Sequence, residues 1–174
     1  MTKLERKIIK LLADFPEREF YSQEIAGKTD CSKASASSIL KRLANKGLVF
    51  KNVKGHMKFY QINVKNPEFK KFRINSVLEK INPLLPKLRG VSEKIILFGS
   101  GSRGEQTFGS DVDLLVLGSD KNKIRVALKK INSKLRINAI VKTPSEWSEM
   151  EVTEPEFFNE VKSGIILHEN VSRI

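Results

Sequence analysis

The sequence has a single cysteine, Cys31, and only two histidines, His56 and His168, in 174 residues. One cysteine excludes an internal disulfide and any zinc site built on several cysteines, and it fits a reducing compartment. The histidines have no companions at metal-ligand spacing. No apolar run reaches the ~18–20 residues of a membrane-spanning helix, and residues 1–7 are too charged for a signal-peptide core. We therefore expect a cytoplasmic protein that makes no membrane contact.

Acidic residues are scarce in the first half of the chain. Residues 1–90 hold 8 Asp/Glu against 20 Lys/Arg, whereas residues 91–174 hold 12 of each, so the net charge of +12 lies entirely in the first half. A basic module that binds a polyanion, joined to a neutral module, would have this pattern. A basic surface that is simply solvated would have it too.

The first 64 residues contain short elements in a recognisable order. Hydrophobic spacing and capping residues predict a helix at residues 4–15, a short strand at 19–21, helices at 23–28 and 33–45, and a hairpin of two strands at 48–53 and 57–62. Ser22 is the expected cap of the second helix, and Gly47 is placed to end the third in a left-handed cap. This order resembles a prokaryotic winged helix-turn-helix domain, in which the third helix enters the major groove of DNA.

Polar and cationic side chains lie where that resemblance implies contact with nucleic acid. They are Ser35, Ser38, Lys41 and Arg42 on the third helix and Lys51, Lys54 and Lys58 on the hairpin. Duplex DNA is therefore the expected partner of residues 1–64. Winged helices in other proteins also serve as protein-docking or dimerisation modules. Both roles stay open for residues 1–64, and so does a homodimer of the chain.

Residues 65–90 are expected to form a linker and a helix that Pro83 and Pro86 interrupt. A second domain is expected over 91–174, with the helix from about residue 75 packing on it. In this part an apolar strand, 94–98, runs directly into Gly99-Ser100-Gly101-Ser102-Arg103-Gly104, and Asp111-Val112-Asp113 opens a second apolar strand.

The pattern of these polar residues indicates phosphate and metal chemistry. Side chains two apart on a strand point to the same side, so Asp111 and Asp113 project together. Two neighbouring carboxylates at the edge of a core repel each other unless a divalent cation bridges them. The glycine–serine turn offers backbone N–H groups to phosphate, and Arg103 adds a cation.

The motif strongly resembles the nucleotidyltransferase superfamily of DNA polymerase beta, most closely its minimal nucleotidyltransferase branch. The resemblance implies an α/β (α+β) chain, with a small mixed-sheet domain after the winged helix. It implies that Gly99, Ser100, Ser102 and Arg103 bind a nucleoside triphosphate, with ATP expected, and that Asp111 and Asp113 are catalytic residues that bind Mg²⁺ or Mn²⁺. The reaction would pass a nucleotidyl group to a hydroxyl of a protein or nucleic acid.

One position departs from the family pattern. Active members carry a third carboxylate on a neighbouring strand. The corresponding strand is expected here at residues 136–141, after a helix from about residue 121 to 133. The residue at the position of the third acid is Asn138, which cannot accept a proton. Glu146, Glu149 and Glu151 follow that strand and are the candidates to replace the third acid. Three hypotheses stay open: a nucleotidyltransferase, a DNA-binding regulator whose second domain is catalytically silent and senses nucleotide or mediates assembly, and an RNA-directed transferase.

Overall fold

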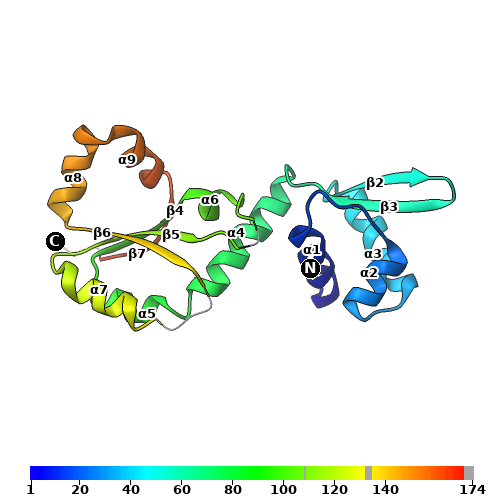
Figure 1. The fold of residues 1–174 in the computed structure, drawn as a ribbon, viewed down its shortest axis with the longest axis horizontal. Helices are drawn as coiled ribbons and strands as arrows, with labels where there is room; N and C mark the ends of the chain where they lie inside the picture. The colour runs from blue at the N-terminus through cyan, green and yellow to red at the C-terminus, as the bar shows by residue number, and fades with distance from the viewer. Residues whose placement is uncertain (108, 132–134, 171–174) are drawn as a thin grey trace. The chain divides into compact units, whose positions relative to one another are not determined.

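The computed structural model describes residues 1–107, 109–131 and 135–170. The chain forms two compact units, Met1–Lys70 and Lys71–Ile174 (Figure 1). Each unit has its own sheet, and the order of elements along the chain agrees with the α/β (α+β) class predicted from the sequence.

The first unit is a winged helix-turn-helix. Its elements are α1 (Lys3–Asp14), β1 (Phe20–Tyr21), α2 (Ser22–Thr29), α3 (Lys33–Asn45), β2 (Val49–Lys54) and β3 (Met57–Ile62). The strands pair in the order β1-β3-β2, and apolar side chains of all three helices and of the sheet form a buried core. The second helix differs from the prediction: it begins at Ser22 itself, its N-cap is Tyr21, and no side chain caps it. Gly47 has the predicted positive φ, 68°.

The second unit is built on a mixed four-stranded sheet with the order β6-β5-β4-β7. Its strands are β4 (Lys94–Phe98), β5 (Val112–Leu117), β6 (Ile137–Lys142) and β7 (Ile165–Glu169), and only β5 and β6 run parallel. Its helices are α5 (Leu85–Arg89), α6 (Gly99–Arg103), α7 (Lys121–Lys129), α8 (Pro144–Thr153) and α9 (Pro155–Lys162). Helix α4 (Pro67–Ile81) spans the division between the units.

Alternation along the strands places two different cores on the two faces of this sheet. Ile95 and Leu97 of β4 pack with residues of α4, α5 and α7, whereas Ile96 and Phe98 pack with residues of α8 and α9 (Figure 1). The interruption predicted at Pro83 and Pro86 is confirmed, because α4 ends at Ile81 and α5 contains Pro86 in its first turn.

The helix after β5 is shorter than the sequence predicted. We expected it to continue to Ser133, but it ends at Lys129, and residues 132–134 lie outside the described part of the chain.

Candidate functional site

The turn that follows β4 requires glycine at its first position. Gly99 has φ of +66°, and a Cβ built on it would lie 2.7 Å from Oδ2 of Asp113. Ordinary side chains rarely adopt this backbone conformation, and a methyl group here would displace the carboxylate of Asp113. The backbone of Gly99 therefore lies directly against the carboxylate of Asp113.

The two aspartates lie at the same end of the sheet as this turn. Asp113 is the second residue of β5 and pairs with Phe98, the last residue of β4. Its side chain is half-buried, whereas Asp111, just before the strand, is exposed. Among the described residues, the Asp111 carboxylate forms no hydrogen bond or ion pair. One carboxylate is thus held in the sheet and the other is free to bind.

Asn138 occupies the neighbouring position on β6. It is paired with Asp113 in the parallel register, and its Nδ2 donates a hydrogen bond of 2.9 Å to Asp113 Oδ1. Within the described ranges, no group of three His, Cys, Asp or Glu side chains lies close enough to hold a metal ion. An amide therefore stands beside Asp113, and a third acid does not complete the cluster in the part of the chain that is described.

Glu146, one of the acids considered as a substitute, is already engaged. It forms a capping box with Thr143 and an ion pair with Lys121. Hydrogen bonds from Lys121 and from the Thr143 backbone lower the pKa of Glu146 to about 2. Its carboxylate therefore caps α8 and anchors α7.

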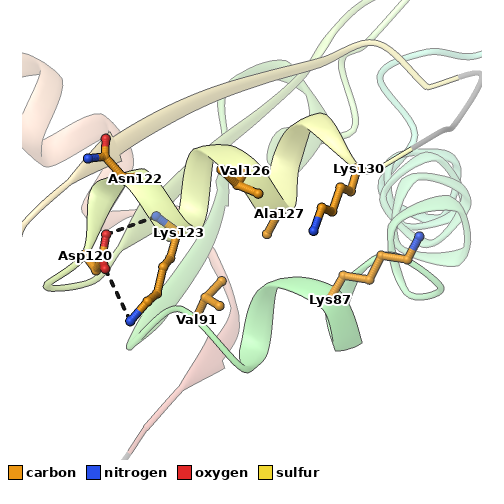
Figure 2. Close-up of a pocket in the computed structure, with 8 residues that line it drawn as sticks. All are labelled: Lys87, Val91, Asp120, Asn122, Lys123, Val126, Ala127 and Lys130. Carbon is orange, nitrogen blue, oxygen red and sulfur yellow. Dashed lines mark hydrogen bonds and ion pairs between the residues drawn. The ribbon is translucent and has the colours of Figure 1, made fainter.

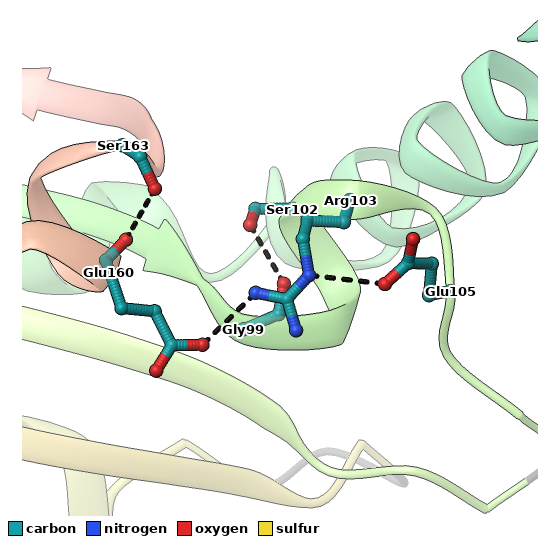
Figure 3. Close-up of polar contacts among 6 residues, drawn as sticks. All are labelled: Gly99, Ser102, Arg103, Glu105, Glu160 and Ser163. Atoms are coloured by element: carbon teal, nitrogen blue, oxygen red, sulfur yellow. Dashed lines mark hydrogen bonds and ion pairs between the residues drawn. The ribbon is translucent and has the colours of Figure 1, made fainter. Parts of the chain in front are cut away.

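The four residues predicted to bind nucleotide differ in how far they are committed to other contacts. Ser100 is half-buried, and its hydroxyl makes no hydrogen bond among the described residues. The Ser102 hydroxyl donates to the carbonyl of Gly99 at 2.8 Å. Arg103 forms ion pairs with Glu105 at 3.1 Å and Glu160 at 3.0 Å (Figure 3).

The contact between Arg103 and Glu160 is one that sequence reasoning missed. It joins α6 to α9 across 57 residues of chain, and no local pattern indicates such a contact. The hydrogen bonds that Arg103 donates to Glu160 and, second in size, to Glu105 raise the pKa of Arg103, which is charged in any case. The guanidinium therefore lies beside the glycine turn with both of its carboxylate partners exposed to solvent.

The donor set at this end of the sheet suits a divalent cation. Carboxylate and amide oxygens are hard ligands of the kind that Mg²⁺ and Mn²⁺ accept. The carboxylate of Asp111 and the amide oxygen of Asn138 have no hydrogen-bond partner in the described ranges, and Asp113 pairs with Asn138 in the sheet. Two carboxylates and one amide oxygen would give the cation a ligand set with one negative charge fewer than three carboxylates would.

The residues predicted to contact nucleic acid form a second candidate site, on the first unit. The four residues of α3 and the three wing lysines are all exposed. Arg42, however, is turned toward α1, where it binds the buried Glu5 at 2.7 Å. A hydrogen bond from the Thr2 backbone, which is the largest cause, and the contact with Arg42 both lower the pKa of Glu5.

The wing lysines also divide into two groups. Lys54 is ion-paired with Glu19, and a hydrogen bond from Lys54 lowers the pKa of Glu19. Lys51 and Lys58 lie on the opposite face of the hairpin from Lys54. Lys51 pairs with Tyr60 and Lys58 with Val53, so both lysines share the face on which Tyr60 is buried. Lys41, Lys51 and Lys58 form no ion pair within the described ranges.

The hydroxyls of α3 are divided in the same way. Ser35 accepts a hydrogen bond of 2.9 Å from Ser32. Ser38 is exposed and has no hydrogen-bond partner in the described part of the chain. The cations and hydroxyl that remain available to a polyanion are therefore Lys41, Lys51, Lys58 and Ser38.

Among the described helices, none is long and apolar enough to cross a membrane.

Comparison with known proteins concerns both units. The family model described as "Nucleotidyltransferase domain" matches residues 65–166, more than half of the chain. A protein of Methanocaldococcus jannaschii named "putative protein adenylyltransferase" is 49% identical over 43 residues, which are 25% of this chain and 43% of that protein. The chain thus spans less than half of the length of this curated relative.

Solved structures resemble the chain more distantly. MepR, a transcription regulator of Staphylococcus aureus, aligns with 49% of this chain and 64% of its own, at 16% identity and a TM-score of 0.41. A "putative nucleotidyltransferase" from Sulfolobus solfataricus aligns with 59% of this chain and 86% of its own, at 16% identity and a TM-score of 0.37.

Proposed function

The chain belongs to the nucleotidyltransferase domain family, and from this premise we propose that its second unit binds a nucleoside triphosphate with Mg²⁺ or Mn²⁺ and transfers the nucleotidyl group to a hydroxyl. The observation that carries this proposal is the packing of the Gly99 backbone against Asp113, with the unpaired Asp111 two residues away. A phosphate group bound by the turn would lie next to the metal-binding carboxylates.

Each residue of the site has a distinct part in this proposal. The backbone at Gly99 and the hydroxyl of Ser100 bind the phosphates, because a positive-φ glycine lets the chain approach them closely. Asp111 and Asp113 hold the cation, which supplies Lewis-acid stabilisation of the charge on the reacting phosphate. Arg103 adds positive charge beside the turn, and Ser102 holds the turn in shape.

The transfer itself is a displacement at phosphorus. The acceptor hydroxyl attacks the α-phosphorus, the bond to the β-phosphate oxygen breaks, and pyrophosphate leaves. The proton of the hydroxyl cannot pass to Asn138, because an amide is not a base. It passes to solvent or to a base on the acceptor, which predicts slow transfer.

The similarity to a protein named as a protein adenylyltransferase supports ATP as the nucleotide and a protein hydroxyl as the acceptor. Nucleic acid is the alternative acceptor, and the unpaired cations of the first unit support it. We propose that Lys41 and Ser38 of α3, with Lys51 and Lys58 of the wing, contact duplex DNA through its phosphates and groove edges.

The hydrogen bond from Asn138 to Asp113 favours a second candidate function, a DNA-binding regulator whose second unit binds nucleotide without turnover. The amide orients Asp113 and lowers the charge of the cluster, which is compatible with nucleotide binding but removes the general base. In this case nucleotide would alter DNA affinity or assembly.

One experiment distinguishes the two functions. The full chain is incubated with α-labelled NTPs and Mg²⁺ or Mn²⁺, in the presence of candidate protein, RNA and DNA acceptors, while calorimetry measures nucleotide binding. Label that appears with the native chain and not with Asp111→Asn establishes transfer. Binding without label establishes the silent form, and absence of both binding and label refutes both functions.

The DNA contact is tested separately by duplex binding over a range of salt concentrations. We expect a steep salt dependence, because each phosphate contact releases counterions. Absence of binding to duplex DNA at low salt would eliminate the DNA-binding part of the proposal, and preference for RNA would redirect it to an RNA acceptor.

A further inference from the structure

The helices of the second unit carry opposite charges on the two faces of the sheet. On one face, helices α5 and α7 with the C-cap residue of α7 expose the cations Lys87, Arg89, Lys123, Arg125, Lys129 and Lys130. On the other face, helices α8 and α9 with the residue between them expose the acids Glu149, Glu151, Glu154, Glu156 and Glu160, beside the cation Lys162 at the end of α9. The unit therefore has a basic side and an acidic side, although residues 91–174 have equal numbers of cations and anions.

A groove on the basic side combines charge with exposed apolar surface. Its volume is about 750 Å³, and it lies between α7 on one wall and α5 with the residues that follow it on the other (Figure 2). Val91, Val126 and Ala127 form its apolar part, and Val126 is 50% exposed.

Lysines surround this apolar part of the groove. Lys123 is paired with Asp120 at 3.4 Å, whereas Lys87 and Lys130 form no ion pair within the described ranges (Figure 2). A partner that supplies an apolar side chain and carboxylates would cover the groove and pair with both free lysines.

The acidic side of the same unit presents these groups. Val152, in the last turn of α8, is 84% exposed. Glu149 precedes it by three residues and shares its side of the helix, and Glu151 is adjacent to it. Neither carboxylate has a hydrogen bond or ion pair in the described part of the chain. We call Glu149, Glu151 and Val152 the acidic knob.

We propose that the acidic knob of one copy of this chain docks in the α5–α7 groove of a second copy. Val152 would cover Val126 and Val91, and the two glutamates would face Lys87 and Lys130. The groove cannot pair with its own copy, because its free lysines would repel each other. The contact is therefore heterologous, so copies join head to tail.

This arrangement predicts weak, reversible and salt-sensitive association. The patch is small compared with stable interfaces, and its charges are exposed and screened by salt. Sedimentation velocity of the full chain at rising concentrations should show a mean mass that grows past the dimer at low salt and falls as salt is added. A monomer at every concentration at low salt would overturn the proposal and assign the groove to another occupant.

Two variants, each defective on one side, test the contact directly. Lys87→Glu with Lys130→Glu blocks the groove, and Val152→Lys blocks the knob; each alone should weaken association at least about tenfold, equivalent to ~1.4 kcal/mol. Mixed together, the knob of the first variant and the groove of the second remain intact. The mixture should form a 1:1 dimer that does not grow further.

The matched control is Arg125→Glu with Lys129→Glu, which changes the charge equally on α7 but outside the groove. Its self-association should be weakened less than that of the groove variant, and should lie closer to that of the native chain. Equal effects of the control and groove variants, or a mixture that stays monomeric while circular dichroism shows both variants folded, would overturn the docking contact.

Discussion

Replacement of Gly99 by alanine tests the geometry on which the proposed nucleotide site depends. The substitution adds a Cβ 2.7 Å from Asp113 Oδ2, about 0.7 Å short of ordinary contact at 3.4 Å. It also imposes φ of +66° on a residue with a side chain, at a cost of about 1–2 kcal/mol. The melting temperature of the second unit should therefore fall by roughly 4–8 °C for each kcal/mol.

The functional loss should exceed what the loss of stability explains. A binding site tolerates displacement of about 0.5 Å, so the shift forced on Asp113 should weaken Mg²⁺-dependent nucleotide binding about tenfold or more. Fluorescence anisotropy of a labelled ATP analogue, measured well below the melting temperature, gives this affinity.

Gly109→Ala is the matched control for backbone strain. Gly109 has φ of +84°, but no atom of the other described residues lies within 4 Å of a Cβ built there. It should lose stability to a similar extent while the affinity changes much less. If Gly99→Ala folds and binds nucleotide as the native chain does, the Gly99 backbone and Asp113 are not parts of one site.

Three further predictions concern other residues. Asn138→Asp replaces the donor beside Asp113 with a third carboxylate; it should lower the melting temperature without metal, raise divalent-cation affinity and increase label transfer, and no change in cation affinity in calorimetry would contradict this. Alanine at each of Lys41, Lys51 and Lys58, which have no ion pair in the described ranges, should reduce the slope of log affinity for duplex DNA against log salt concentration by ~0.9 for every phosphate that the variant no longer neutralises. Lys54→Ala is the control, and filter binding should show a smaller change in slope, because Lys54 is paired with Glu19. An equal slope for all four variants would contradict the assignment. The pKa of Glu146 falls from 4.5 to about 2, chiefly through Lys121, so the stabilisation by its carboxylate is full above pH 4.5 and is lost as the pH falls toward 2. In Lys121→Met, the free energy of unfolding measured with urea should depend less on pH over that range. A pH profile equal to that of the native chain would refute the role of this pair.

The sequence predicted local features well because their causes are local. The apolar stripe of α3, the left-handed Gly47 and the prolines after α4 each determine the structure within a few residues. Asp111 and Asp113 could be placed at one end of the sheet because they lie at the start of an apolar run that predicts a strand. The resemblance to a family placed Asn138 on a neighbouring strand, but its hydrogen bond to Asp113 depends on the parallel pairing of β5 and β6, which only the structure shows.

Long-range ion pairs could not be predicted in this way. Arg42 looked available for DNA because it lies on the polar face of α3, but its partner, Glu5, is 37 residues earlier. Arg103 is held by Glu160 for the same kind of reason. Such pairs depend on which helices meet in the fold, and charge spacing along one helix contains no information about that.

We propose that Asp111 and Asp113, beside the Gly99 turn, form a metal-dependent nucleotide site. The most direct test is calorimetric titration of the full chain with ATP, in Mg²⁺ and in EDTA, beside the Asp111→Asn/Asp113→Asn variant. We expect the native chain to bind ATP in Mg²⁺ only, and the folded variant to bind none. Equal ATP affinity for the two chains, or for the native chain with and without metal, would contradict it.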